Sequence, residues 1–219
     1  MNTVLTFWRS TIGKKVVMGV TGLIGLGFVI GHMAGNLQAF AGAEQLDAYG
    51  ALLHGPLHEL VLIARVVLIA AVILHVTAAY QLTMLSRAAR PVDYASRKPQ
   101  VSTLAARTLR WGGVLLLVFI VFHILHFTIG SVHPDFVEGR IYRNLATGFE
   151  VKWVAVFYLV AMIALGMHLF HGAWSSMRTL GVAKQKAHPI KRYLPVVLAV
   201  VISLGFAAIP LAFLLGVLR

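Results

Sequence analysis

The chain has 219 residues, of which 59% are apolar and 12% are charged, and it contains no cysteine. Soluble globular proteins carry roughly twice this share of charged residues, so the composition favours a polytopic membrane protein. A chain without cysteine has no disulfide, no cysteine-ligated zinc site and no iron–sulfur cluster of its own.

Five apolar runs are each long enough to cross a membrane as a helix. They cover residues 16–40, 57–85, 111–129, 153–177 and 193–218. Roughly 20 helical residues span the hydrocarbon core, and backbone groups in lipid must hydrogen-bond within their own segment. The sequence therefore predicts an all-α membrane protein with five transmembrane helices in a single membrane domain over residues 1–219. A cleaved signal peptide is the alternative interpretation of the first run, but that run exceeds the usual apolar length of about 7–15 residues.

Charged residues fall on alternate sides of these runs. Fourteen of the 19 Lys and Arg residues precede the first run or lie between runs two and three or four and five: Arg9, Lys14, Lys15, Arg87, Arg90, Arg97, Lys98, Arg107, Arg110, Arg178, Lys184, Lys186, Lys191 and Arg192. Six of the 7 acidic residues lie on the opposite side. The positive-inside rule then predicts a cytoplasmic N-terminus and an outside C-terminus. The net charge of +12 fits a basic face against membrane lipid, so we expect no nucleic-acid partner.

Histidines are the main chemical signal. Six of the 10 lie within predicted spans: His32, His75, His123, His126, His168 and His171. Imidazoles at bilayer depth are costly and often functional. A single one would suit a hydrogen-bonded packing role, but here each of the first four runs carries at least one. Packing alone gives no reason for that even distribution.

Depth along the predicted helices sorts four of these histidines into two levels. Counted from the outer ends of their spans, His32 and His123 lie about 15–17 Å deep, and His75 and His168 lie about 27–29 Å deep. Two histidines at matching depth on facing helices can ligate one haem iron. The pattern predicts a diheme four-helix bundle, with an outer haem b on His32 and His123 and an inner haem b on His75 and His168.

Spacing leaves two alternatives open. His126 and His171 each lie one turn, about 5 Å, from His123 and His168, and helix tilt can absorb that difference. The glycine-rich run MGVTGLIGLGFVIGHMAG, residues 18–35, either leaves room for a haem to approach the backbone or marks close helix packing.

Several motifs carry a resemblance to a known family. They are GHMAGNLQAFAG at 31–42, RVVLIAAVILHVTAAYQL at 65–82, MHLFHGAWSSMRTLG at 167–181, and AHPIKRY at 187–193 followed by GFAAIPLAFLLG at 205–216. Together they resemble the cytochrome b558-type membrane anchor of bacterial succinate dehydrogenases and fumarate reductases. The likeness runs from about residue 10 to residue 216.

This resemblance implies a five-helix subunit in a bacterial inner membrane that holds two haems b. It implies a flavoprotein subunit and an iron–sulfur subunit docked on the cytoplasmic face. By motif it assigns the axial ligands to His32, His75, His123 and His168, with Arg110 and Gly113 upstream of His123 as in the family. His126 and His171 are left as quinone, propionate or proton contacts, or as packing residues.

The resemblance also implies a reaction. The chain would be the membrane subunit of a succinate:quinone oxidoreductase, with succinate oxidised to fumarate on the flavoprotein partner. Electrons would pass through the partner's clusters and the inner and outer haems to a quinone, most readily menaquinone. Some relatives work in reverse as fumarate reductases, and the residues do not fix the direction.

Quinone contacts are expected at water-accessible ends, because quinone reduction takes up protons. On the outer side the candidates are Tyr49, His54 and Glu59. On the inner side Ser10 and Lys14 could contact quinone or form a solvated helix start. Arg65 is a candidate partner of a haem propionate, or it snorkels to the outer interface.

Two other functions compete with this interpretation. A haem-free, histidine-lined metal or proton transporter would also explain intramembrane imidazoles, although it would favour carboxylates inside the bundle. A diheme cytochrome subunit of a nitrate reductase or hydrogenase would share the ligand chemistry but not the GHMAGN and HLFHGAWSSMRTLG motifs.

Overall fold

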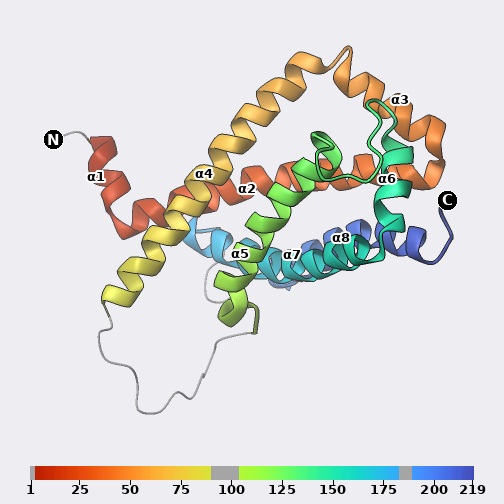
Figure 1. The fold of residues 1–219 in the computed structure, drawn as a ribbon. Coiled ribbons are helices and arrows are strands. Elements are labelled where there is room, and N and C mark those ends of the chain that lie inside the picture. Colours follow the sequence, from red (N-terminus) through yellow and green to blue (C-terminus); the bar gives the residue numbers. More distant parts are fainter. Residues whose placement is uncertain (1–2, 90–103, 183–188) are drawn as a thin grey trace.

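Five long apolar helices dominate the fold (Figure 1). The computed structural model describes residues 3–89, 104–182 and 189–219. The membrane-spanning helices are α2 (Thr11–Asn36, extended by the 3-10 helix η1, Leu37–Ala41), α4 (His58–Ala88), α5 (Leu104–His123, continued by the π-helix η2, Ile124–Thr128), α7 (Lys152–Thr179) and α8 (Pro189–Leu214). Among these described residues there is no strand. The predicted all-α membrane protein with five transmembrane helices is confirmed.

The helix ends differ in detail from the predicted runs. Helix α5 begins at Leu104, seven residues before the apolar run at 111, because Arg107 and Arg110 are good helix formers at a polar interface. Helix α8 begins at Pro189, whose fixed φ and missing N–H suit a first helical position. Five of the predicted basic residues, Arg90, Arg97, Lys98, Lys184 and Lys186, lie outside the described residues.

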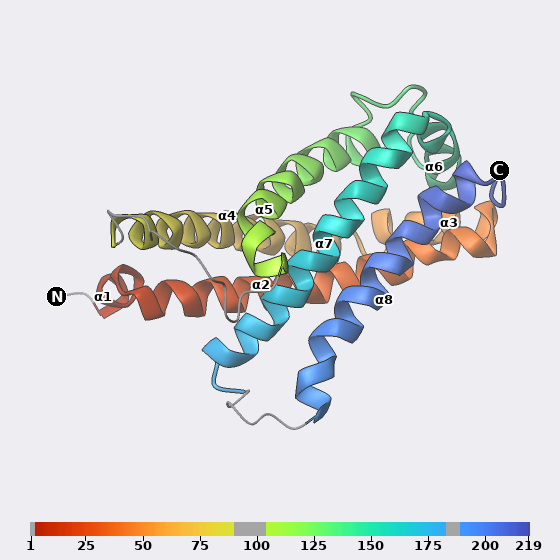
Figure 2. The ribbon, with the colours of Figure 1, turned by 90° about the horizontal axis from the view of Figure 1, so that it is seen from below.

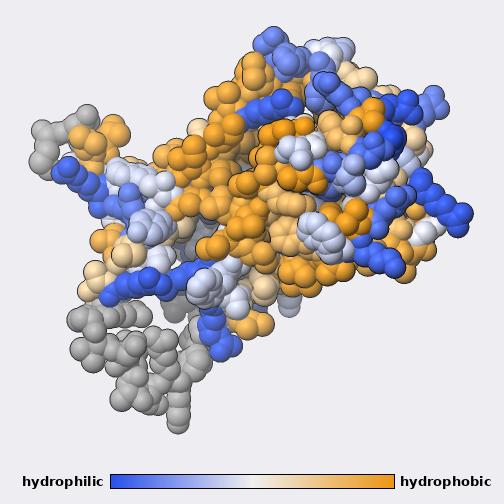
Figure 3. Space-filling model, in the orientation of Figure 1, coloured by the Kyte–Doolittle hydropathy of each residue, from blue (hydrophilic) through white to orange (hydrophobic). Residues whose placement is uncertain are grey.

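Three short helices lie at the two ends of the spans (Figure 1). Helix α1 (Thr3–Arg9) lies at the end that we call the basic end, with the last turns of α4 and α7 and the first turns of α5 and α8. Helices α3 (Ala43–His54) and α6 (Ile141–Glu150) form the opposite end, which we call the cap end. A largely hydrophobic belt separates the hydrophilic residues of the two ends on the visible face (Figure 3). This arrangement is that of a multi-pass membrane protein.

Helix α7 is the centre of the helix packing. It lies against α8 along much of its length and also contacts α2 and α5 (Figure 2), while α4 packs against α2 and crosses it at an angle (Figure 1). Small residues allow the close approaches: a Cβ on Gly166 of α7 would lie 2.7 Å from the Ser203 hydroxyl of α8, and one on Gly205 would lie 2.4 Å from the Met33 sulfur of α2. Glycine at such positions lets membrane helices approach closely.

The most compact core lies at the cap end. Its buried members are Ala39, Leu46, Leu145, Phe149, Val154, Ala155, Tyr158 and Ile209. Asp47 ties α3 to α6, because its Oδ1 accepts a hydrogen bond from the Tyr142 N–H at 2.9 Å and its Oδ2 lies 3.4 Å from Arg140 Nε. The buried Asn144 side chain donates to the Val137 carbonyl at 2.8 Å and accepts from the Val137 N–H at 2.9 Å.

Candidate functional site: two facing histidine pairs

Four helices each contribute one histidine to two facing pairs. His32 of α2 faces His123 of α5, with ring centroids 5.7 Å apart and ring planes at 82°. His75 of α4 faces His168 of α7, with centroids 6.0 Å apart and planes at 56°. We call these the cap-side pair and the basic-side pair. Over the described residues, α2 does not pack extensively on α5, nor α4 on α7. The two rings of each pair therefore extend across a space between their helices.

The two pairs lie at two levels of the bundle. His75 contacts α2 near Gly22, where an added Cβ would lie 3.4 Å from His75 Cε1. Gly22 and His32 are ten residues apart on α2, which is about 15 Å of helix. These pairs and this order are those that the depth argument predicts; whether the four side chains ligate haem stays a prediction.

The basic-side pair is oriented by a hydrogen bond to a neighbouring helix. His75 Nδ1 lies 3.1 Å from the Met18 carbonyl, so that nitrogen carries the proton and donates it. The Nε2 of His75 then keeps its lone pair. Ligand histidines in metal sites are held in this way, with the second ring nitrogen donating to a carbonyl or carboxylate. His168 has a buried Nδ1 that lacks a hydrogen-bond partner among the described residues.

The cap-side pair is enclosed by aromatic side chains and one amide. The His32 ring stacks on Phe28, with centroids 5.2 Å apart, and lies 5.7 Å from Phe206 of α8. The Asn36 amide nitrogen lies 3.3 Å from both His32 ring nitrogens and donates to the His32 carbonyl at 2.7 Å. His123 Nδ1 lies 3.2 Å from the Tyr158 hydroxyl of α7.

His126 lies beside the cap-side pair and His171 lies one turn beyond His168. His126 is 0% exposed, its Nδ1 lies 3.2 Å from the same Tyr158 hydroxyl, and its ring centroid is 4.8 Å from that of His133. His171 is partly exposed on α7. His126 contacts His123 through their shared Tyr158 hydroxyl.

The geometry of both pairs fits a bis-imidazole metal centre. An imidazole nitrogen binds a metal ion at about 2 Å and lies about 1 Å from its ring centre, so two rings on one metal ion have centroids about 6 Å apart. The centroid distances of 5.7 and 6.0 Å in the two pairs agree with this value. Over the described residues, no group of three or more His, Cys, Asp or Glu side chains could hold a metal ion.

The two residues predicted on the inner side have structural roles at the basic end. Ser10 is the N-cap of α2: its hydroxyl accepts from the Gly13 N–H at 2.9 Å and donates to the Phe7 carbonyl at 2.8 Å. Lys14 is 7% exposed, and its Nζ donates to the carbonyls of Trp8 and Arg9 at 2.8 and 3.0 Å. Ser10 therefore forms an exposed helix start, whereas Lys14 is buried because its ammonium caps the last turn of α1.

The residues predicted on the outer side are not brought into one cluster. Tyr49 packs its ring against Gly35, where an added Cβ would lie 2.7 Å from the ring. His54 is exposed, with Nδ1 2.9 Å from the Gly50 carbonyl. Glu59 and Arg65 are exposed on α4. Quinone or propionate contacts of these side chains stay predictions.

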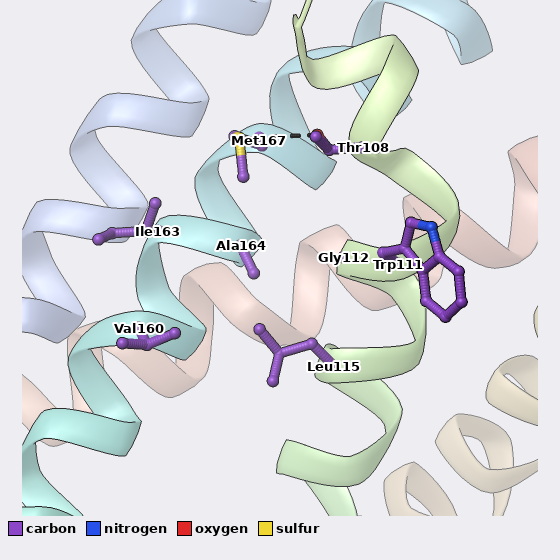
Figure 4. A pocket seen from close by; sticks show the side chains of 8 residues that line it. All are labelled: Thr108, Trp111, Gly112, Leu115, Val160, Ile163, Ala164 and Met167. Carbon is purple, nitrogen blue, oxygen red and sulfur yellow. Dashed lines mark hydrogen bonds between the residues drawn. The ribbon is translucent and has the colours of Figure 1, made fainter.

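An apolar groove of about 250 Å³ lies between α5 and α7 (Figure 4). It is lined by Thr108, Trp111, Gly112, Leu115, Val160, Ile163, Ala164 and Met167. The Thr108 hydroxyl lies 3.8 Å from the Met167 sulfur and donates to the Leu104 carbonyl at 2.9 Å. None of the paired histidines lines the groove. Its lining is apolar, like the surfaces that lipid tails cover in a membrane.

Sequence reasoning missed the residues that hold the histidines, among them Tyr158, Asn36 and Phe206. Asn36 lies one turn after His32 and belongs to the GHMAGN motif, so its i, i+4 spacing could have indicated the contact. Tyr158 and Phe206 reach histidines from other helices, and no spacing within their own runs reports that.

Comparisons with protein-family models, curated proteins and solved structures find no match to this chain. The interpretation of the two pairs therefore depends on their geometry and on the sequence motifs.

Proposed function

We propose that the chain is the diheme cytochrome b membrane anchor of a succinate:quinone oxidoreductase. The observation that carries this proposal is the placement of one histidine from each of four helices into two facing pairs at bis-imidazole distance. The GHMAGN and HLFHGAWSSMRTLG motifs support succinate:quinone oxidoreductase over other diheme cytochromes. In this proposal the cap-side pair is the outer haem site and the basic-side pair is the inner one.

The chain's own residues bind and orient the ligands. The Met18 carbonyl fixes the His75 tautomer, and Gly22 lets the His75 ring lie close to the α2 backbone. Phe28, Asn36 and Phe206 restrict the His32 ring. Two bound haems b would carry electrons from the partner's clusters to a membrane quinone, for which we propose menaquinone.

The basic end is the proposed docking face for the partner subunits. Its described basic side chains include Arg9, Lys15, Arg87, Arg107, Arg110, Arg178, Lys191 and Arg192. We propose that the chain lies in a bacterial inner membrane. Under the positive-inside rule its basic end then faces the cytoplasm. The flavoprotein and iron–sulfur subunits would bind there, and the succinate chemistry would occur on the flavoprotein.

Haem counting in single and double variants tests the proposal. The purified complex should hold two haems b per chain by the pyridine haemochrome assay, and His32→Ala, His75→Ala, His123→Ala or His168→Ala should each lose one. The pairing makes a sharper prediction: His32→Ala with His123→Ala should lose one haem, whereas His32→Ala with His75→Ala should lose two. His58→Ala, an exposed histidine at the start of α4, is the matched control and should lose none.

The same preparation separates the competing functions. Succinate should reduce both haems in membranes that contain the partner subunits. Two haems that succinate does not reduce would favour the diheme subunit of another respiratory oxidoreductase. A chain without haem would overturn the proposal and favour the histidine-lined transporter.

A further inference from the structure

One hydroxyl group contacts both histidines of VFHILHF, residues 121–127. The Tyr158 oxygen lies 3.2 Å from His123 Nδ1 and 3.2 Å from His126 Nδ1. Tyr158 is 6% exposed, and its ring lies edge-on to those of Phe119 and Phe149, at 4.9 and 5.1 Å between centroids. Buried packing of this kind holds the hydroxyl in place between the two imidazoles.

The number of protons available at this hydroxyl restricts the tautomers of His123 and His126. The phenol has one proton to donate and can also accept a hydrogen bond. If both imidazoles carried a proton on Nδ1, the phenol proton would have no acceptor there; if neither did, one Nδ1 would be left without a donor. The phenol both donates and accepts, and neither Nδ1 is left without a partner, only when one histidine donates from Nδ1 and the other accepts at Nδ1. The two neutral imidazoles then have opposite tautomers.

Opposite tautomers allow one metal ligand and one donor. A neutral imidazole protonated on Nδ1 has a free lone pair on Nε2, whereas one that accepts at Nδ1 carries its proton on Nε2. We propose that Tyr158 is a positioning residue that lets only one of the two histidines bind haem iron through Nε2. The inference is based on the proposed function and deepens it, because it selects between the two histidines that spacing leaves open.

The position of His32 decides which histidine is the ligand. His123 faces His32 at 5.7 Å, so His123 donates from Nδ1 to the phenol oxygen and keeps its Nε2 lone pair for iron. The phenol proton then goes to His126 Nδ1. His126 carries its proton on Nε2, a fully buried atom that lacks a partner among the described residues.

The backbone around His126 gives a second, independent observation. Residues 124–128 form a π-helical turn, with the Ile129 N–H bonded to the Ile124 carbonyl at 2.9 Å. The turn ends the helix that begins with α5, and it shifts the side chains after His123 away from the regular α-helical positions. The turn carries His126, the residue that receives the phenol proton, and leaves His123 at the end of regular α-helix.

Redox titration and electron paramagnetic resonance of Tyr158→Phe test the inference. The variant keeps the ring but removes the acceptor for the His123 Nδ1–H, which lowers the basicity of the ligand and favours the reduced iron. We expect two haems per chain, a more positive midpoint potential and a changed low-spin signal for the outer haem, and an unchanged inner haem. Tyr142→Phe removes a hydroxyl from the same cap end, away from the histidines, and should change neither haem.

His126→Leu gives a second test that keeps the His123–Tyr158 contact. The phenol then loses its acceptor and becomes a weaker acceptor itself, because hydrogen bonds in a chain strengthen one another. The midpoint potential of the outer haem should become more positive, as in Tyr158→Phe, but by a smaller amount. The double variant, Tyr158→Phe with His126→Leu, should have the same outer-haem potential as Tyr158→Phe alone. If Tyr158→Phe fails to assemble, the shift of the outer-haem potential in His126→Leu tests the role of Tyr158 by itself.

Unchanged outer-haem potential and signal in these variants would overturn the role of Tyr158 while leaving the diheme proposal intact. A wild-type chain without haem would overturn the proposed function itself, so the two failures are distinguishable.

Discussion

Asp47 shows how a single carboxylate joins two elements that are far apart in sequence. It accepts the Tyr142 N–H at the start of α6, where helix N–H groups have no partner within the helix. Asp47→Ala would leave that N–H without its acceptor, and we expect a loss of about 1–2 kcal/mol in the free energy of unfolding. Thermal unfolding in detergent micelles should show a lower Tm.

Two variants serve as controls for Asp47. Asp47→Asn keeps an oxygen acceptor and should lose less than Asp47→Ala. Glu44→Ala, at an exposed position one turn earlier in α3, should leave the Tm close to that of the wild type. Equal Tm values for Asp47→Ala and Glu44→Ala would contradict the role assigned to the Asp47 carboxylate.

Residue contacts were predictable where they depend on position along one helix. The rise of 1.5 Å per residue converts a sequence position into a depth, which is why two levels of histidines could be predicted, while the choice of His123 and His168 over His126 and His171 depended on the motif resemblance. The contacts of Tyr158 and Lys14 could not be predicted. They depend on how helices are rotated about their axes and on a short helix, α1, that folds back over Lys14.

The turn after η2 is the element with the clearest backbone requirement. Gly130 has φ +80°, a left-handed conformation, and an added Cβ would lie 2.4 Å from Phe136 Cγ. Gly130→Ala should therefore cost about 1–2 kcal/mol from conformation alone, and more from the clash with a ring. We expect a lower Tm in the same thermal assay.

Gly139 separates the two causes. It has φ +76°, and an added Cβ there would meet no described atom within 4 Å. Gly139→Ala should thus show the conformational cost without the clash. A Gly130→Ala variant that is no less stable than Gly139→Ala would rule out the Phe136 contact as a source of strain.

Long elements were predictable from the sequence and short ones were not. An apolar run of 19 or more residues has one low-energy form in lipid, so the five spans follow from composition. Helices α1, α3 and α6 have 7, 12 and 10 residues and lie at the polar ends. Helices this short are marginal in isolation and depend on packing, such as that of Gly50 in α3 against Ile141 in α6.

For the whole molecule, the charge distribution predicts an orientation that labelling can measure. The chain contains no cysteine, so each introduced cysteine is a single site. Ser86→Cys lies exposed near the basic end of α4, and Ala48→Cys lies exposed in α3 at the cap end. In intact cells a membrane-impermeant maleimide should label Ala48→Cys and not Ser86→Cys. Both should react in detergent, and the reverse pattern in cells would contradict the positive-inside assignment.

The central place of α7 has a consequence for biogenesis. Helices α2 and α4 pack together, but α5 packs mainly against α7, which follows it in the chain. Before α7 is inserted, α5 lacks its main neighbour, and both histidine pairs lack the final arrangement that α7 supplies through Tyr158 and His168. Insertion of the fourth span must therefore precede final assembly of either pair, and any cofactor that the pairs bind can be enclosed only after that step.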